Sequence, residues 1–304
     1  MPTNHIKTIL LTVGAAALLG APAAFAADTT AFNQFSTAAT TSSVTVDYSP
    51  IQQFSKAFGK EERGRTKISY SAVEQQGQRF LNVYLGRLAN VQVSSLSRND
   101  QLAYWLNTHN MLVMQAMTDP KARKDMKKAR GTADAPGPMW TQKRITVQGA
   151  ELSLHDIEKY IVVANFADKP NAVFGLYQGT KGSPPFKGDG FTGATLDADL
   201  AEAGKAHLKK NFKAKGSKAQ IPAVMQWYAA ELFGGDNEAL RTHLVSLSSD
   251  KNAKKLAGVT EFEARKFSYS SDEFVVRQQI ASGGTGGGGF GGGNSGGGGG
   301  GGGS

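Results

Sequence analysis

The pattern of apolar and polar positions is clearest in the segment Arg98–Met117, which contains no Gly or Pro. Ser97 and Asp100 form a capping-box pattern at its start, which is typical of a helix N-terminus. The strongest apolar residues of the segment fall on one stripe of a 3.6-residue wheel: Leu102, Leu106, Val113 and Met117. The segment is therefore predicted to be a helix with one buried face.

Weaker patterns predict further elements on both sides of this helix. Helical spacing or helix end signals occur at 48–59, 73–88, 153–164, 196–212, 222–233 and 237–248. Extended segments are expected in a hairpin at 144–152, at 172–177 and near 267–276. Residues 119–140 contain several Gly and Pro and are predicted to form a long loop. Together these elements predict an α+β fold, a mainly helical single domain with a small sheet built from the three extended segments.

Polar residues interrupt the apolar face of the predicted 98–117 helix. His109 falls between apolar positions on the wheel, Asn110 lies beside Leu106, and Asn107 lies at the edge of the apolar arc. Buried polar groups need hydrogen-bond partners, so these side chains are expected to hold something in place. Glu158 flanks the apolar stripe of the 153–164 helix, and we expect it to be half-buried.

The two ends of the chain differ from this central part. Residues 1–26 combine a basic start, an apolar run at 9–20 and small residues at Ala24 and Ala26, which is the pattern of a cleavable signal peptide. An uncleaved N-terminal anchor is the alternative. Residues 27–47 are expected to be an exposed leader and residues 48–282 the globular domain. Residues 283–304, very rich in Gly, are expected to be a disordered tail that acts as a spacer or is simply an untethered terminus.

Composition narrows the possible chemistry. The chain has no Cys, which excludes Cys catalysis, Cys-ligated zinc and a lipoprotein anchor. The signal-peptide pattern predicts a periplasmic or secreted protein, and no later apolar stretch is long enough for a transmembrane span once the signal peptide is cleaved. The formal net charge of +9 is concentrated at 121–130 and at 209–218. These basic runs are either solvated surface or contact sites for an anionic envelope polymer or lipid headgroups, and nucleic acid is not an expected partner.

Four segments resemble a known family in sequence and in order: AYWLNTHN (103–110), MWTQKRITVQGAELSLHDIE (139–158), FGLYQGTKGSPPF (174–186) and QWYAAELFGG (226–235). They are similar to the domain of unknown function 547 family, which occurs in exported bacterial proteins and in plant proteins. The resemblance covers roughly residues 48–274. The family's recurrent positions correspond here to Trp105, Asn107, Asn110, Leu154, Ile157, Glu158, Gly179, Pro184 and Trp227.

Three positions depart from what the resemblance implies. His109 stands where the family usually has Tyr, and Gln178 and Ser183 stand where many members have Cys. Any thiol chemistry of the family is therefore impossible in this chain. The family has no general activity that would settle the function.

Two interpretations of these polar residues remain open. In the first, Ser183 is a nucleophile, His109 a base, and Glu158 an acid or base whose pKa is raised by burial. Ser183 lacks a G-x-S-x-G elbow, which weakens this reading. In the second, they fix the Gly- and Pro-rich loop at 178–185 against two helices. The positioning residues would then be Trp105, Asn107, Asn110, Glu158, Gln178, Gly179 and Pro184.

The corresponding functions belong to different classes. The favoured prediction is a non-catalytic binding module for an anionic envelope polymer or a protein partner. The alternative is a Ser- or Glu/His-dependent hydrolase that acts on an envelope substrate. No metal motif such as H-E-x-x-H is present in the sequence, and neither a metal nor a cofactor is expected. The sequence does not indicate an oligomeric state.

Overall fold

The computed structural model describes residues 29–274, and the predicted signal peptide and Gly-rich tail lie outside the described residues. Its longer helices are α1 (Ser49–Phe58), α3 (Gln78–Ala89), α4 (Arg98–Ala116), α8 (Leu196–Asn211) and α11 (Asn237–Ser246). Its shorter α-helices are α2 (Tyr70–Ala72), α5 (Pro120–Lys124), α6 (Met126–Arg130), α7 (Pro138–Thr141), α9 (Ala223–Gln226), α10 (Ala229–Phe233) and α12 (Asp250–Leu256). The mainly helical α+β class predicted from the sequence is confirmed.

Helices of other types complete the set. Two are π-helices, η2 (Val73–Gly77) and η4 (Asp156–Val163). Three are 3₁₀-helices, η1 (Thr29–Phe35), η3 (Val93–Ser95) and η5 (Pro170–Gly175). The predicted 73–88 helix thus begins with a π-helical turn, and the 153–164 helix is largely π-helical. The wider turn of η4 buries three successive residues, Asp156, Ile157 and Glu158.

Helix α4 is the central element and packs against α3, η4 and η5. Nearly every residue from Gln101 to Met114 is buried, so the helix has no solvent-exposed face over this length. Its N-terminus is capped as predicted, because the Ser97 hydroxyl accepts a hydrogen bond from the backbone N–H of Asp100. A rigid, fully surrounded helix therefore carries Asn107, His109 and Asn110.

The strands form three small sheets instead of the single one predicted. One is β1 (Gly59–Glu61) with β2 (Thr66–Ile68), and one is the expected hairpin of β3 (Lys143–Val147) with β4 (Ala150–Ser153). Its turn residues Gln148 and Gly149 both have positive φ, as a tight hairpin turn requires. The third sheet has the order β5 (Lys213–Lys215), β6 (Lys218–Ile221), β7 (Glu261–Ala264).

Four other predictions were wrong. Residues 172–177, predicted as a strand, lie mostly in η5, and the predicted loop 119–140 contains α5, α6 and α7. The predicted helix 222–233 is interrupted between α9 and α10 at Trp227 and Tyr228. The leader is not simply exposed, because Phe32 and Phe35 of η1 are buried and the Phe35 ring packs edge-on against Trp105.

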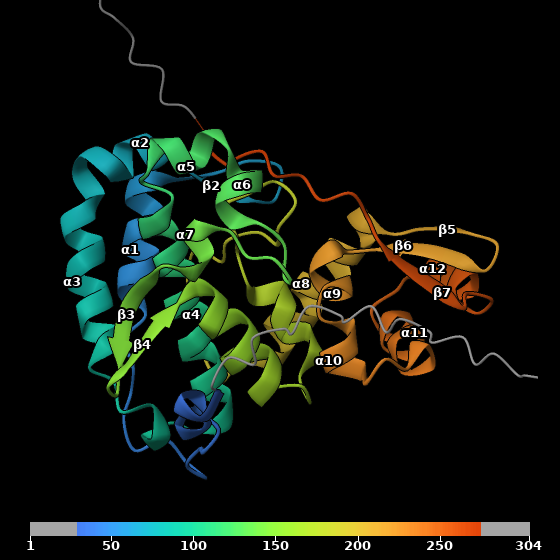
Figure 1. Ribbon diagram of the computed structural model, residues 1–304, viewed down its shortest axis with the longest axis horizontal. Coiled ribbons are helices and arrows are strands. Elements are labelled where there is room, and N and C mark those ends of the chain that lie inside the picture. Colours follow the sequence, from blue (N-terminus) through green and yellow to red (C-terminus); the bar gives the residue numbers. More distant parts are fainter. Residues whose placement is uncertain (1–28, 275–304) are drawn as a thin grey trace, which may run out of the picture.

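Figure 1 shows the helices α1 to α4 gathered on one side of the molecule and α9 to α12 with β5–β7 on the other. Two apolar clusters correspond to these sides. The larger is built around α4, and the smaller around α8, α9 and α11. Among residues 29–274, no helix is both long and apolar enough to cross a membrane.

The C-terminal strap, residues 267–273, runs back from the smaller side to the larger one (Figure 1). It pairs with the Gly- and Pro-rich loop through backbone hydrogen bonds from Lys181 to Ser270 and from Gly182 to Ser268. The final described residues also pair with β2, where Ile68 and Glu273 form an isolated bridge. The strap thus covers the loop that contains Ser183.

Candidate functional site

A buried carboxylate, Glu158 on η4, is the centre of the polar cluster in the larger core. Its Oε1 accepts hydrogen bonds from Arg130 (3.0 Å), Gln178 (3.1 Å) and the Tyr228 hydroxyl (2.7 Å). Its Oε2 accepts one from the Trp140 indole at 2.6 Å. Glu158 is 0% exposed, which corrects the expectation that it would be half-buried.

Arg130 supplies the countercharge to this carboxylate. It is the last residue of α6 and is 1% exposed, although the sequence places it in the basic run at 121–130. Its guanidinium lies between two indole rings, 5.2 Å from the centre of Trp140 and 4.3 Å from that of Trp227. Its Nε donates to the side-chain amide oxygen (Oε1) of Gln178 at 3.0 Å. The ion pair is therefore both desolvated and fully hydrogen-bonded, the condition under which a buried pair is tolerated.

The pKa of Glu158 follows from these neighbours. Burial alone would raise it, but the Arg130 charge, followed by His109 and the Trp140 hydrogen bond, holds the pKa well below its ordinary value. The prediction of a raised pKa was therefore wrong. A carboxylate held ionised by four donors is a poor proton donor and a poor base, because protonation would disrupt the hydrogen bonds and the ion pair that stabilise its charge.

His109 lies beside this cluster and is 0% exposed. Its Nε2 is 3.8 Å from Glu158 Oε2, and its Nδ1 is 3.2 Å from Asn110 Oδ1. Asn110 Oδ1 also accepts a hydrogen bond from the backbone N–H of Tyr177. The ring thus belongs to α4 and approaches the Glu158 carboxylate of η4 without a hydrogen bond to it.

The two asparagines of α4 hold backbone from two different segments. Asn110 donates to the carbonyl of Gly175 and accepts from the N–H of Tyr177, just before the Gly- and Pro-rich loop. Asn107 makes the same pair of bonds to the N–H and the carbonyl of Phe191. Each side-chain amide thus replaces one missing pair of backbone hydrogen bonds.

The loop itself is fixed from several directions. Gly179 has φ +70°, and a Cβ there would lie 2.8 Å from the Met117 sulfur. Ser183 is 0% exposed, and its hydroxyl lies within hydrogen-bond distance of the carbonyls of Thr180 (2.8 Å) and Pro184 (3.0 Å). Arg65 in turn donates to the Ser183 carbonyl at 3.2 Å.

The structure therefore brings together Glu158, His109, Asn110 and Gln178 but not all of the predicted site residues. Ser183 bonds to its own loop, Asn107 bonds to Phe191, and Trp105 packs against Phe35 and Tyr104. Sequence reasoning missed Arg130 and Trp140, and it considered Tyr228 only as an aromatic residue of a groove or a core, not as a hydrogen-bond partner of Glu158. Trp140 and Tyr228 lie inside the segments that resemble the family, a signal that could have drawn attention to them; no comparable signal marks Arg130.

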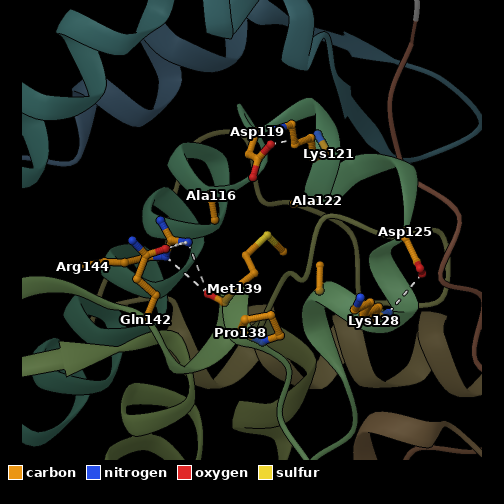
Figure 2. Close-up of a pocket in the computed structure, with 11 residues that line it drawn as sticks. Ala116, Asp119, Lys121, Ala122, Asp125, Lys128, Pro138, Met139, Gln142 and Arg144 are labelled. Carbon is orange, nitrogen blue, oxygen red and sulfur yellow. Dashed lines mark hydrogen bonds between the residues drawn. The ribbon is translucent and has the colours of Figure 1, made fainter.

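An open cleft of about 290 Å³ lies on the surface between α4, α5, α6 and α7 (Figure 2). Met139 lies at its centre, with Arg144 and Gln142 on one side and Asp125 and Lys128 on the other. Asp119 and Asp125 accept hydrogen bonds from the backbone N–H groups of Lys121 in α5 and Lys128 in α6. Their charges are therefore partly used in capping these helices.

The positively charged side chains of this cleft, unlike its two aspartates, are not engaged by ion-pair or helix-capping partners within the described residues. Among the ion pairs of residues 29–274, none contains Lys121, Lys128 or Arg144. Arg144 is half-buried and donates only to uncharged oxygens, the Met139 carbonyl and the Gln142 side chain. Burial lowers the pKa of Arg144, and the negative charge of Asp119 partly offsets this decrease. We call this site the basic cleft.

Within the same part of the chain, no group of three or more His, Cys, Asp or Glu side chains is placed to hold a metal ion. The comparison with protein families matches residues 93–208 to the family described as "Protein of unknown function, DUF547". The chain resembles this family over its central part, which contains α4, the basic cleft, η4 and the Gly- and Pro-rich loop. Searches of curated proteins and of solved structures found no significant match.

Proposed function

We propose that this protein is an exported binding module of the bacterial envelope that holds an anionic polymer in the basic cleft. The observation that carries the proposal is the half-buried Arg144, which forms no ion pair within residues 29–274 and interacts with the Asp119 carboxylate only without direct contact. A partly desolvated guanidinium without a hydrogen-bonded carboxylate favours binding of an anion, because a carboxylate or phosphate replaces the water lost on burial. Lys121 and Lys128 extend the positive charge along the cleft.

The Arg130–Glu158 cluster has a positioning role in this proposal. It fixes α6, whose first turn forms one wall of the cleft, to η4 and to the loop at 178–185. Because these charges are buried in a hydrogen-bond network, the network holds α6, and with it one wall of the cleft, in a fixed position. The binding surface and the buried cluster are thus two parts of one arrangement.

The binding proposal is tested with fluorescein-labelled polyphosphate and polygalacturonate, which carry phosphate and carboxylate groups. Arg144→Gln should weaken binding of at least one polymer about tenfold or more, since a charge-assisted hydrogen bond contributes roughly 1.5–3 kcal/mol. The double variant Lys121→Gln/Lys128→Gln should also weaken polymer binding, and the loss should be larger at low salt. The matched control is Lys254→Gln/Lys255→Gln on α12, where both lysines are exposed. Equal losses in the control pair and the cleft pair would refute a specific cleft.

Hydrolysis is the competing function, and one observation weighs against it. Ser183 is turned toward carbonyls of its own loop, while His109 and Glu158 lie in a cluster that is 0% exposed. A nucleophile needs its base within hydrogen-bond reach and a path for the substrate. A fluorophosphonate probe tests this directly: labelling of Ser183 that disappears in His109→Gln would replace the binding proposal with the hydrolase.

Export is part of the same proposal and is tested at the N-terminus. Residues 1–26 have the pattern of a signal peptide. Expression of the full chain in a Gram-negative host, followed by mass spectrometry of the periplasmic fraction, should find a mature chain that begins at Ala27. Recovery of the uncleaved chain in the cytoplasm would contradict export.

A further inference from the structure

A second surface, distant in sequence from the basic cleft, lies between α1 and α3. It is a groove of about 450 Å³, lined by Pro50 and Gln53 of α1, by Gln76, and by apolar side chains and two arginines of α3. We call it the α1–α3 groove. Figure 1 shows α3 at the outer edge of the molecule, with α1 beside it. Its floor contains Pro50, Phe80 and Tyr84, and Phe80 packs against Phe54 of α1 with ring centres 6.0 Å apart.

Two residues of α3 have no explanation inside this chain. Val83 is 52% exposed, the highest value among the large apolar side chains of the described residues. Gly86 lies within the same helix, and a Cβ there would meet no atom within 4 Å. A glycine inside a helix costs about 0.5–1 kcal/mol relative to alanine, so an exposed one needs a reason. A close approach of another backbone would supply it.

The charges around the groove indicate what could approach. Arg79 and Arg87 line it, and neither takes part in an ion pair within residues 29–274, although Arg87 is near enough to help lower the pKa of Asp47. No Asp or Glu lines the groove. Arg79, Val83, Gly86 and Arg87 follow helical spacing i, i+4, i+7 and i+8 and therefore lie on one side of α3. The two arginines are separated by eight residues, or about 12 Å along the axis.

From this arrangement we propose that the α1–α3 groove binds an acidic amphipathic helix of a partner protein. Its apolar residues contact Val83 and Phe80, its backbone lies close to Gly86, and two carboxylates, seven or eight residues apart, pair with Arg79 and Arg87. A helix presents such carboxylates on one face at the required separation. A fatty acid has a single carboxylate and would satisfy only one of the two arginines.

The experiment selects helical peptides of about 16 residues, roughly 24 Å long, from a display library on the full chain, with counter-selection on Val83→Glu. The expected result is enrichment of sequences with two acidic residues seven or eight positions apart and leucine-like residues between them. Failure to enrich any peptide, or enrichment of peptides without the acidic pair, overturns the proposal.

Individual variants then test the geometry with one enriched peptide. Arg79→Gln and Arg87→Gln should each weaken binding about five- to tenfold, and Val83→Glu should abolish it. Val245→Glu is the matched control, because Val245 is also exposed (38%) but lies on α11. Gly86→Ala should raise the unfolding midpoint and yet weaken binding at least fivefold. Unchanged binding in Gly86→Ala or equal loss in Val245→Glu contradicts the proposed docking.

Competition with oleate, a fatty acid, distinguishes a lipid ligand of the groove from a protein partner. The groove is an acyl-chain site, and the peptide proposal is overturned, if three results occur together. Oleate binds the wild-type chain but not Val83→Glu, oleate completely displaces every enriched peptide, and the affinity for oleate falls in only one of the two arginine variants. If oleate does not bind, or leaves the peptide in place, the protein-partner proposal stands.

Discussion

Replacement of Glu158 by Gln tests the central physical claim about the buried cluster. The substitution keeps the shape of the side chain but removes its charge, while Arg130 remains 1% exposed. It also places an NH₂ group among four donors, which come from Arg130, Gln178, Tyr228 and Trp140. Breaking one partner of a buried ion pair costs about 3–5 kcal/mol. This is a large part of the roughly 5–15 kcal/mol that stabilises a whole domain.

Urea unfolding followed by tryptophan fluorescence measures this cost at pH 7. Glu158→Gln should lower the free energy of unfolding by about 3–5 kcal/mol with an unchanged m-value, and lower Tm by about 6–20 °C. The matched control is Asp168→Asn, which makes the same chemical change in an exposed pair with Arg98. That pair should contribute less than about 1 kcal/mol.

A double variant separates the ion pair from the shape of the site. Arg130→Met/Glu158→Gln removes both charges. Its loss in free energy of unfolding should be about 1–3 kcal/mol smaller than the sum of the losses in the two single variants. A loss in Glu158→Gln no larger than that in Asp168→Asn would refute the reasoning, because the carboxylate would then contribute nothing beyond a surface contact.

The same variant changes the response to acid. The pKa of Glu158 is lower in the folded protein than in the unfolded chain, so its contribution is complete above about pH 5 and is lost as pH falls below the ordinary Glu value. Wild-type stability should therefore fall by up to about 1.4 kcal/mol per pH unit from this group alone at lower pH. Glu158→Gln should lack this component, and an equally steep acid limb in the variant would contradict the assignment.

Three further predictions concern other parts of the fold. Burial lowers the pKa of His207 to about 3, so stability should fall as pH drops below about 6.5, and His207→Gln should flatten the decline between pH 6.5 and 4.5. Asn110→Leu leaves a buried N–H and a buried carbonyl without partners and should cost about 2–4 kcal/mol in urea unfolding. Gly182→Ala puts a Cβ 2.5 Å from the backbone nitrogen of Ser268 and should cost about 1–3 kcal/mol and increase proteolysis of the C-terminal strap.

Each of these has a result that would count against it. An unchanged pH slope in His207→Gln would mean that another group titrates in this range. A cost below about 1 kcal/mol for Asn110→Leu would show that water reaches the backbone groups. Gly86→Ala is the control for Gly182→Ala, because the added methyl meets no atom there. If Gly182→Ala is as well tolerated as that control, the strap is not held close to the loop.

Local signals predicted much of the fold. The cap at Ser97, the length of α4 and the Gln148–Gly149 turn depend on residues within a few positions of one another, and all three occur in the structure. The third sheet was missed because β6 pairs in parallel with β7 from about forty residues later, and no local pattern records such pairing. The segment at 172–177 has an apolar run that suits a buried strand or a buried 3₁₀-helix equally well.

The candidate site was predictable only in part, for a similar reason. Asn107 and Asn110 stood out because they interrupt an apolar face, and both proved to hold backbone groups. The direction of the Glu158 pKa could not be obtained from its own helix, since Arg130 is 28 residues away. Arg130 itself was hidden among surface lysines. Its burial depends on Trp140 and Trp227, which converge only after folding.

The contact between Arg65 and Asp272 joins residues 207 positions apart. A ribosome must therefore make almost the whole described chain before β2 and the loop at Ser183 acquire their last partners. Until then the nascent chain is incompletely folded, and its earlier segments stay accessible to chaperones and proteases. A stop codon placed just before residue 267 would remove 38 of the 304 residues, and with them the strap contacts to the loop at Ser183 and to Arg65.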